Sequence, residues 1–269
     1  STYHSVLPLL RYDIIKGYLI YDSSETATEL PLAIDSDKVV YIPFMPADGI
    51  TAALNKSQKL AMELFPSSTH YTYFHSADLC NASPEIIAEL AFAVSQLNSF
   101  DLAFFAGINR YKNRDETLLP RYHRIISGMT VTHMGAIISH RLHTSLDGYS
   151  RIYKYAMDYD FFLRAFFMRC KSYSSDLPFA IVSTEGISSN HPYLALRDCA
   201  RSRWRIAAQR PLLMPLLFLY TFISFAKRLT FDFFTILSPN FLLKLRILLS
   251  RGRLSIHSNE VVPPIEENI

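Results

Sequence analysis

Short apolar stretches punctuate the first hundred residues of the chain. Residues 18–21 and 39–42 are apolar runs, and each gives way to a polar or proline-containing segment. Residues 71–74 and 102–105 are likewise short and rich in aromatic or apolar side chains. Runs of this length and composition are typical of buried strands. The pattern therefore predicts four strands in this part of the chain.

Stretches of helical periodicity lie between these strands. Residues 50–64 carry apolar side chains at helical spacing, with Pro66 just beyond as a stop signal. Ser83 and Pro84 supply a cap and a first-turn proline before residues 86–97. Strands that alternate with helices indicate an α/β fold, with a mostly parallel central sheet flanked by helices.

The second half of the chain continues this pattern less regularly. Residues 155–168 predict a helix in which charged side chains are set among aromatic ones. Residues 179–182 predict another strand, and the polar segment 185–190 that follows predicts a loop.

Acidic residues stand where several of these strands end. Asp22 follows the first strand, Asp78 follows the third, and Asp48 lies in a loop ahead of a helix. Ligands of parallel sheets bind beyond the carboxyl ends of the strands. The three acids therefore predict a nucleotide and metal site, although aspartates also occur at such junctions for turn chemistry alone.

The C-terminal part of the chain is apolar and basic. Residues 211–226 form an uncharged run of 16 residues, shorter than the about 20 that span a bilayer. The next apolar stretch, residues 231–249, is interrupted by Pro239. This pattern favours helices that lie in the membrane interface. A helical hairpin or re-entrant span, and a packing or homodimer surface, are the alternatives.

Charge and cysteine content narrow the class of protein. The formal net charge of +3 does not argue for nucleic acid. Basic residues cluster after residue 196, so we expect contact with an anionic membrane surface through residues 201–253. Three scattered cysteines without CxxC spacing argue against disulfides and structural zinc. Because the start at Ser1 carries no signal-peptide pattern, we expect a cytoplasmic protein, peripheral on the inner face of the membrane.

Six segments of the chain form a recognisable ordered series. They are YLIYDSSETAT at 18–28, ADGITAALNKS at 47–57, HSAD at 75–78, THMGAII at 132–138, the Tyr149 to Arg164 helix motif, and EGIS at 185–188. In this order the segments resemble the colanic-acid and O-antigen branch of family 2 glycosyltransferases, and the resemblance extends over residues 18–190.

The resemblance implies a GT-A fold and inverting transfer of a sugar from a nucleotide-diphosphate donor to a lipid-linked or oligosaccharide acceptor. Asp158 matches the position of the catalytic base, which deprotonates the acceptor hydroxyl. Asp78 matches the acidic motif that holds Mg²⁺ or Mn²⁺ at the diphosphate. Residues that match donor-binding segments are Asp22, Ser24, Asp48, Asn55 and Lys56. Residues expected at the acceptor or diphosphate are His133, Asp160, Arg164, Gly186 and Ser188.

Simpler roles compete with these assignments. Asp158 is also placed to cap its own helix or to pair with Arg164 or Lys154. Asp160 is an alternative base but better suited to pair with Arg164. A histidine on an apolar face, such as His133, is more often a core residue.

The chain also departs from the family pattern on the donor side. Only 17 residues precede Tyr18, where the family has its first strand further upstream. The loop after Asp22 lacks the family's glycines, and Thr51 and Ala52 replace its tyrosine and aspartate. These departures motivate a second hypothesis, a catalytically weakened GT-A-like scaffold that binds a partner glycosyltransferase or the membrane. A third is a soluble α/β phosphate-binding protein.

The sequence therefore predicts three regions. Residues 1–195 form the glycosyltransferase domain with a shortened or missing first strand. Residues 196–255 form a basic, apolar, helical membrane-associating region, and residues 256–269 a flexible tail.

Overall fold

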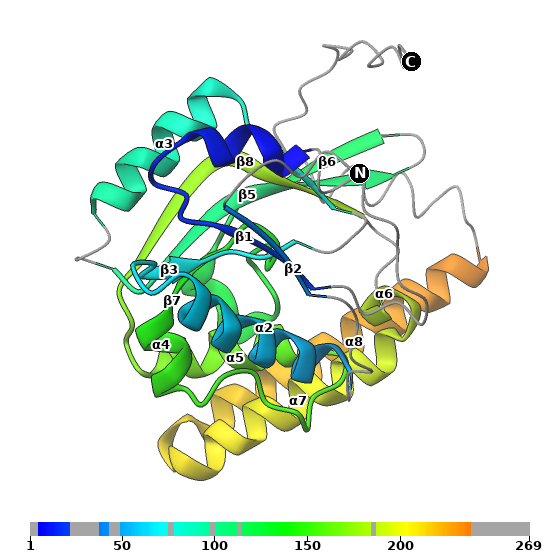
Figure 1. The fold of residues 1–269 in the computed structure, drawn as a ribbon. Helices are drawn as coiled ribbons and strands as arrows, with labels where there is room; N and C mark the ends of the chain where they lie inside the picture. The colour runs from blue at the N-terminus through cyan, green and yellow to red at the C-terminus, as the bar shows by residue number, and fades with distance from the viewer. Residues whose placement is uncertain are drawn as a thin grey trace.

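A computed structural model describes residues 5–21, 38–42, 49–74, 78–96, 100–111, 114–183 and 187–237 of the chain. Over these residues the protein is a mixed α/β fold with helices packed around a curled sheet (Figure 1). The strands are β1 (Tyr18–Tyr21), β2 (Val39–Ile42), β3 (His70–Tyr71), β4 (Leu79–Cys80), β5 (Leu102–Tyr111), β6 (Arg114–Leu118), β7 (Ile137–Ser139) and β8 (Ser172–Ser183). The α-helices are α2 (Ile50–Leu64), α3 (Pro84–Ser95), α4 (His140–Ser145), α5 (Met157–Phe167), α6 (Ile187–Asn190), α7 (Pro192–Gln209) and α8 (Met214–Leu237). Short 3₁₀ helices are η1 (Leu7–Arg11), η2 (Tyr122–Ser127) and η3 (Pro211–Leu213).

The larger sheet has the strand order β3-β7-β5-β8-β4, with β6 also paired to β5. β5 and β8 are parallel, whereas the other pairs in this sheet are antiparallel. β1 and β2 form a separate parallel pair. The prediction of a mostly parallel sheet is therefore corrected to a mixed sheet. Strand–helix alternation did not reveal this, because β6 is a charged strand that lacks the apolar pattern of a buried one.

β5 separates two halves of the hydrophobic core. Leu102 and Phe104 belong to one cluster, which contains the aromatic side chains of α5. Ala103 and Phe105 belong to the other, which contains Ile86 of α3. Successive residues of a strand point to opposite faces of the sheet, so this alternation places helices on both faces.

Most predicted helices are confirmed. α2 has the predicted bounds, and α3 begins at Pro84 with Ser83 as its cap, since the Ile86 amide donates to Ser83 Oγ at 3.4 Å. α5 fills most of the predicted 155–168 helix. The strand lengths differ more, because β5 and β8 extend well beyond their apolar centres and β3 ends at Tyr71.

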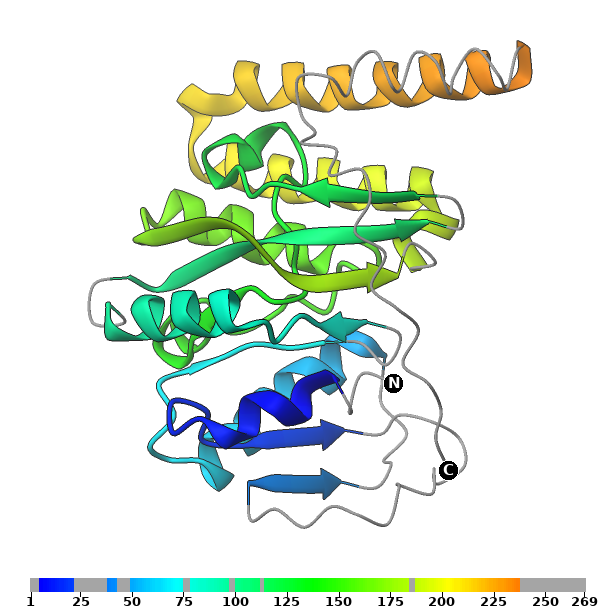
Figure 2. The same cartoon turned by 90° about the horizontal axis from the view of Figure 1, so that it is seen from above.

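α7 and α8 form a helical layer at one end of the molecule, and β1 and β2 lie at the opposite end (Figure 2). α7 packs on α5 and α8 packs on α7. Ile206 and Ala207 of α7 and Leu217 of α8 belong to the core cluster of α5. The C-terminal helices, which continue beyond residue 195, therefore pack against the rest of the domain and share its core. The expected tail, residues 256–269, lies outside the described residues.

Candidate functional site

Asp158 stands in the first turn of α5, where backbone amides lack helical partners. Its Oδ1 accepts a hydrogen bond from the Tyr159 amide at 2.7 Å. The side chain is partly exposed, yet its carboxylate lies among enough protein that burial raises its pKa. A partly exposed carboxylate with a raised pKa on a rigid helix start has the properties of a general base.

Tyr73 lies within reach of the charges of both Asp158 and Asp78. Burial raises the pKa of the Tyr73 phenol, and the nearby Tyr149, Asp158 and Asp78 groups raise it further. Asp78 is 2% exposed and precedes β4, whereas Tyr73 follows β3 and Asp158 begins α5. Two aspartates from segments far apart in the chain are thus close enough to the Tyr73 phenol for their charges to raise its pKa.

His133 and Tyr149 complete this group. The His133 Nε2 and the Tyr149 hydroxyl are 2.9 Å apart, and the ring centroids of His133 and Tyr73 are 5.0 Å apart. Burial raises the pKa of Tyr149, and Asp158 is among the charges that add to the shift. We call Tyr73, Asp78, His133, Tyr149 and Asp158 the Asp158 cluster.

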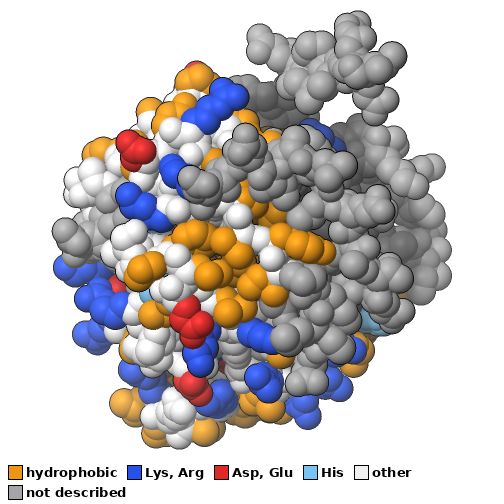
Figure 3. Space-filling model, viewed as in Figure 1, with side chains coloured by type: hydrophobic (Ala, Val, Ile, Leu, Met, Phe, Trp, Pro, Cys, Tyr) orange, Lys and Arg blue, Asp and Glu red, His pale blue; other side chains and the backbone are white. Residues whose placement is uncertain are grey.

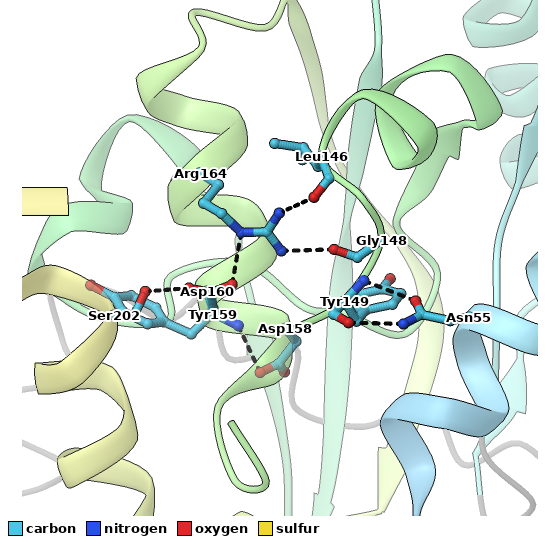
Figure 4. A network of polar contacts seen from close by, with 9 residues as sticks. All are labelled: Asn55, Leu146, Gly148, Tyr149, Asp158, Tyr159, Asp160, Arg164 and Ser202. Atoms are coloured by element: carbon cyan, nitrogen blue, oxygen red, sulfur yellow. Dashed lines mark hydrogen bonds and ion pairs between the residues drawn. The ribbon is translucent and has the colours of Figure 1, made fainter. Parts of the chain in front are cut away.

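Asp160 and Arg164 form a separate, structural network on α5 (Figure 4). Asp160 Oδ2 accepts from Arg164 Nε at 2.7 Å, and Asp160 Oδ1 accepts from Ser202 Oγ on α7 at 2.8 Å. Arg164 also donates to the carbonyl oxygens of Leu146 and Gly148. The expected Asp160–Arg164 pair is confirmed, and it joins α5 to α7 and to the loop after α4.

Asn55 fastens α2 to the same loop. Its Nδ2 donates to the Tyr149 carbonyl and its Oδ1 accepts from the Tyr149 amide, both at 2.8 Å. Gly148 has a φ of +67°, and a Cβ there would come 2.6 Å from Asn55 Oδ1. The close approach of loop and helix therefore requires glycine at this position. The donor-binding role of Asn55 stays a prediction.

The other predicted residues are exposed on helices or lie outside the described part of the chain. Lys56 is exposed on α2 and Ser188 is exposed on α6. The predicted positions outside the described residues are Asp22, Ser24, Asp48 and Gly186.

A divalent cation takes several oxygen ligands. The part of the chain that the structure describes groups no three His, Cys, Asp or Glu side chains for a metal. Asp78 alone does not make up such a site, and Asp22 and Asp48 lie outside the described residues. The described residues therefore do not fit Mg²⁺ or Mn²⁺ on their own, and the cofactor stays a prediction.

Tyr73 is a residue of the Asp158 cluster to which the sequence analysis assigned no functional role. Tyr71 and Tyr73 are two positions apart next to a short strand, so an extended backbone presents both on one side. Burial raises the pKa of both phenols, and the Tyr71 hydroxyl lies 2.6 Å from His143 Nδ1. The tyrosine alternation was visible in the sequence, but their aspartate and histidine neighbours come from distant segments.

The fold and this site define a mixed α/β protein with an acidic, tyrosine-lined cluster at the start of α5. No protein-family model matches the chain, and a comparison with curated protein sequences finds no significant match.

Proposed function

We propose that the protein is an inverting glycosyltransferase of the GT-A type that acts in surface polysaccharide biosynthesis. It transfers a sugar from a nucleotide-diphosphate donor to a lipid-linked or saccharide acceptor. The observation that carries the proposal is the position of Asp158, which is partly exposed in the first turn of α5 where the surrounding protein also raises the pKa of its carboxyl. The Asp160–Arg164 pair leaves Asp158 as the aspartate of this helix without an arginine partner among the contacts of the described residues.

In this proposal Asp158 accepts the proton of an acceptor hydroxyl. The hydroxyl oxygen forms the new bond to the anomeric carbon, and the bond to the diphosphate oxygen breaks on the opposite face. The electron pair leaves with the nucleoside diphosphate. A carboxylate whose pKa is raised toward the working pH is a more effective base for this step. In this proposal Tyr73 and Asp78 belong to the same site as Asp158, since both aspartates add to the effect of burial in raising the pKa of the Tyr73 phenol.

The proposed location is the inner face of the membrane, with α8 as the contact. The segment Pro211–Phe234 is long and apolar enough to cross a bilayer, and 11% of the residues in its most apolar stretch are buried. The helix is longer than the uncharged run of residues 211–226, because α8 continues through Lys227 and Arg228 to Leu237. In Figure 3, hydrophobic and basic side chains lie together along the edge that Figure 1 assigns to α7 and α8. This combination suits a helix lying in an anionic interface.

A non-catalytic scaffold is the second candidate function. Asn55, Asp160 and Arg164 are committed to bonds within the protein, which is what a domain that retains the architecture without donor chemistry would keep. In this case the apolar surface of α8 would serve membrane or partner binding alone.

Isothermal titration of the full chain with UDP-sugars and GDP-sugars, in the presence of Mn²⁺, separates the two candidates. The glycosyltransferase proposal predicts saturable binding of at least one donor. Absence of binding with every donor, while the protein still sediments with anionic vesicles, would support the scaffold and contradict the enzyme.

A further inference from the structure

Two tyrosine hydroxyls connect His143 of α4 with His133 of the Asp158 cluster. The Tyr71 hydroxyl lies 2.6 Å from His143 Nδ1. The Tyr149 hydroxyl lies 2.9 Å from His133 Nε2. The side chains of Tyr71 and Tyr149 are also hydrogen-bonded to each other. The four side chains therefore form a linear network of three hydrogen bonds, which we call the His133–His143 network.

Ring packing and burial hold this network in place. The ring of His143 contacts the rings of both tyrosines, at centroid distances of 5.6 and 5.5 Å. Tyr149 packs on Phe161 of α5 at 4.7 Å, and Asn55 of α2 binds its backbone through two hydrogen bonds (Figure 4). His133, His143 and Tyr149 are at most 6% exposed. Their polar atoms in the network are therefore shielded from water and depend on one another for hydrogen bonds.

The network needs a definite number of protons. Each of its three hydrogen bonds requires one proton, and each phenol supplies one, since burial raises the pKa of both hydroxyls. The third proton must come from an imidazole nitrogen that faces a tyrosine. All three bonds therefore form only when one of the two nitrogens, His133 Nε2 or His143 Nδ1, carries a proton and the other accepts a hydrogen bond. The protonated nitrogen of one histidine thus determines that of the other.

The two distances indicate which histidine supplies the third proton. Hydrogen bonds donated by hydroxyl groups are typically shorter than those donated by N–H groups. The 2.6 Å contact at His143 fits a Tyr71 hydroxyl that donates to Nδ1. The 2.9 Å contact at His133 fits an N–H group that donates to the Tyr149 hydroxyl. Burial is the main cause that lowers the pKa of His143 to about 4, so its ring is neutral at neutral pH and Nδ1 can accept.

We propose that Tyr71 and His143 are positioning residues that hold His133 with its proton on Nε2. His133 Nε2 donates to the Tyr149 hydroxyl, which donates to Tyr71. The Tyr71 hydroxyl in turn donates to His143 Nδ1. A neutral His133 in this form has a lone pair on Nδ1, which can accept a hydrogen bond from a hydroxyl but cannot donate one to a phosphate oxygen.

This form of His133 bears on the choice that the sequence left open between an acceptor contact and a diphosphate contact. Under the proposed function, His133 suits a sugar hydroxyl of the acceptor rather than the diphosphate. This choice rests on the proposed glycosyltransferase function. The order of protons in the His133–His143 network does not, because it follows from hydrogen bonds within the folded chain.

Nuclear magnetic resonance of the full chain with ¹⁵N-labelled histidine identifies the protonated nitrogen of each imidazole without any substrate. The spectra are recorded about two pH units above the ordinary pKa of histidine, so that the rings are neutral. We expect His133 to carry its proton on Nε2, and Nδ1 of His143 to carry none. A wild-type protein in which His133 carries its proton on Nδ1 would overturn the proposal.

Tyr71→Phe tests whether the network sets this state. The variant keeps the aromatic ring but removes the acceptor of the Tyr149 hydroxyl, whose proton then turns to His133 Nε2, so that His133 carries its own proton on Nδ1. We expect the ratio of the two His133 forms to shift by about tenfold or more, because a buried donor would otherwise lack an acceptor. Tyr153→Phe, at a buried tyrosine of the same core cluster outside the network, is the control and should leave the ratio unchanged. An unchanged ratio in Tyr71→Phe would contradict the proposal.

His143 offers a second pair of variants at the far end of the network. His143→Phe removes the acceptor of Tyr71 and should shift His133 in the same direction as Tyr71→Phe. His143→Asn places a carbonyl oxygen near the position of Nδ1 and should keep the wild-type form. A His133 that responds equally to both substitutions, or to neither, would show that His143 does not position it. Sugar transfer and donor binding are measured separately, so this result would leave the glycosyltransferase proposal standing.

Discussion

Asp158 and Asp160 are two positions apart on α5 and meet different surroundings. Asp160 is 1% exposed and bonded to Arg164 and Ser202, whereas Asp158 is partly exposed and bonded to the Tyr159 amide. The i,i+4 spacing of Asp160 and Arg164 made their pairing predictable from the sequence. The Ser202 contact and the surroundings of Asp158 could not be predicted from the sequence. The Ser202 partner, for example, comes from α7, about forty positions further along the chain. The two aspartates therefore differ in their surroundings, although they are neighbours on the same helix.

His143 makes the stability of the fold depend on pH. Burial, with smaller effects from His140 and Arg164, lowers the pKa of His143 to about 4, and its Nδ1 lies 2.6 Å from the Tyr71 hydroxyl. In the unfolded chain the imidazole takes up a proton near pH 6.5, whereas the folded protein does so only near pH 4. The free energy of unfolding should therefore fall as the pH is lowered through this window, by roughly 3 kcal/mol from His143.

Urea unfolding at several pH values between 7 and 4 measures this loss. His143→Gln keeps a polar partner for Tyr71 and should make the decline clearly shallower. His140 and His70, whose pKa values burial also lowers, should account for the remainder. An unchanged slope in His143→Gln would contradict the assignment.

Asn55→Ala tests the bond between α2 and the loop before α5. The substitution removes both hydrogen bonds to the Tyr149 backbone, so we expect the free energy of unfolding to fall by about 2 kcal/mol. Thermal or urea unfolding measures this, with Lys59→Ala on the exposed side of α2 as the control. A variant as stable as the control would show that the two bonds do not hold the loop.

Secondary-structure elements were predictable where their periodicity was strong. α2, α3 and α5 follow from apolar spacing and from the Ser83–Pro84 start. The sheet order was not predictable, because β6 is charged and the first half of β8 is polar. Antiparallel neighbours such as β3 and β7 are far apart in the sequence, so the local pattern of apolar and polar residues does not show that they pair.

Arg203 joins four elements, which makes it the critical residue of the C-terminal helices. It is 1% exposed on α7 and donates to the Ile126 carbonyl and to the Tyr159 hydroxyl, and its Nη1 lies 3.5 Å from Thr221 of α8. The guanidinium also lies over the Tyr159 ring, 5.3 Å from its centroid. Sequence analysis assigned this arginine to the basic surface, since nothing local distinguishes it from its neighbours.

Arg203→Met should lower the free energy of unfolding by roughly 2 to 4 kcal/mol, because it leaves buried oxygen atoms without a donor. Arg201→Gln, at an exposed position on the same helix, should change it by less than about 0.5 kcal/mol. Urea unfolding of both variants measures the difference. Equal stability of Arg203→Met and Arg201→Gln would contradict the structural role.

The apolar helix α8 lies on the outside of the molecule. Leu217 and Thr221 of α8 are buried against the domain, whereas Phe222 is 71% exposed and Leu219 and Leu229 are more than half exposed. Monomeric soluble proteins rarely leave such a surface open to water, and large exposed patches mark interaction sites. Under the proposed function, this surface lies in the membrane interface.

Phe222→Asp should weaken binding to anionic vesicles by about tenfold or more, because it replaces an aromatic side chain that the proposal inserts into the interface with a charge that an anionic interface repels. Vesicle sedimentation measures the change, and the free energy of unfolding should stay within about 0.5 kcal/mol of the wild type. Ile152→Asp, also at a well-exposed apolar position but outside α8, is the control. Undiminished binding of Phe222→Asp would exclude α8 as the membrane contact.

The central claim is that Asp158 is the base of a glycosyl transfer. The direct measurement is the rate of sugar transfer by Asp158→Asn beside its control Asp176→Asn, an exposed aspartate on β8. Because burial raises the pKa of Asp158, the neutral amide should leave the free energy of unfolding at pH 7 equal or higher. We predict that Asp158→Asn folds and binds the donor but transfers sugar at least about 100-fold more slowly, whereas Asp176→Asn keeps full activity. A folded Asp158→Asn variant that transfers sugar at the wild-type rate would contradict the account.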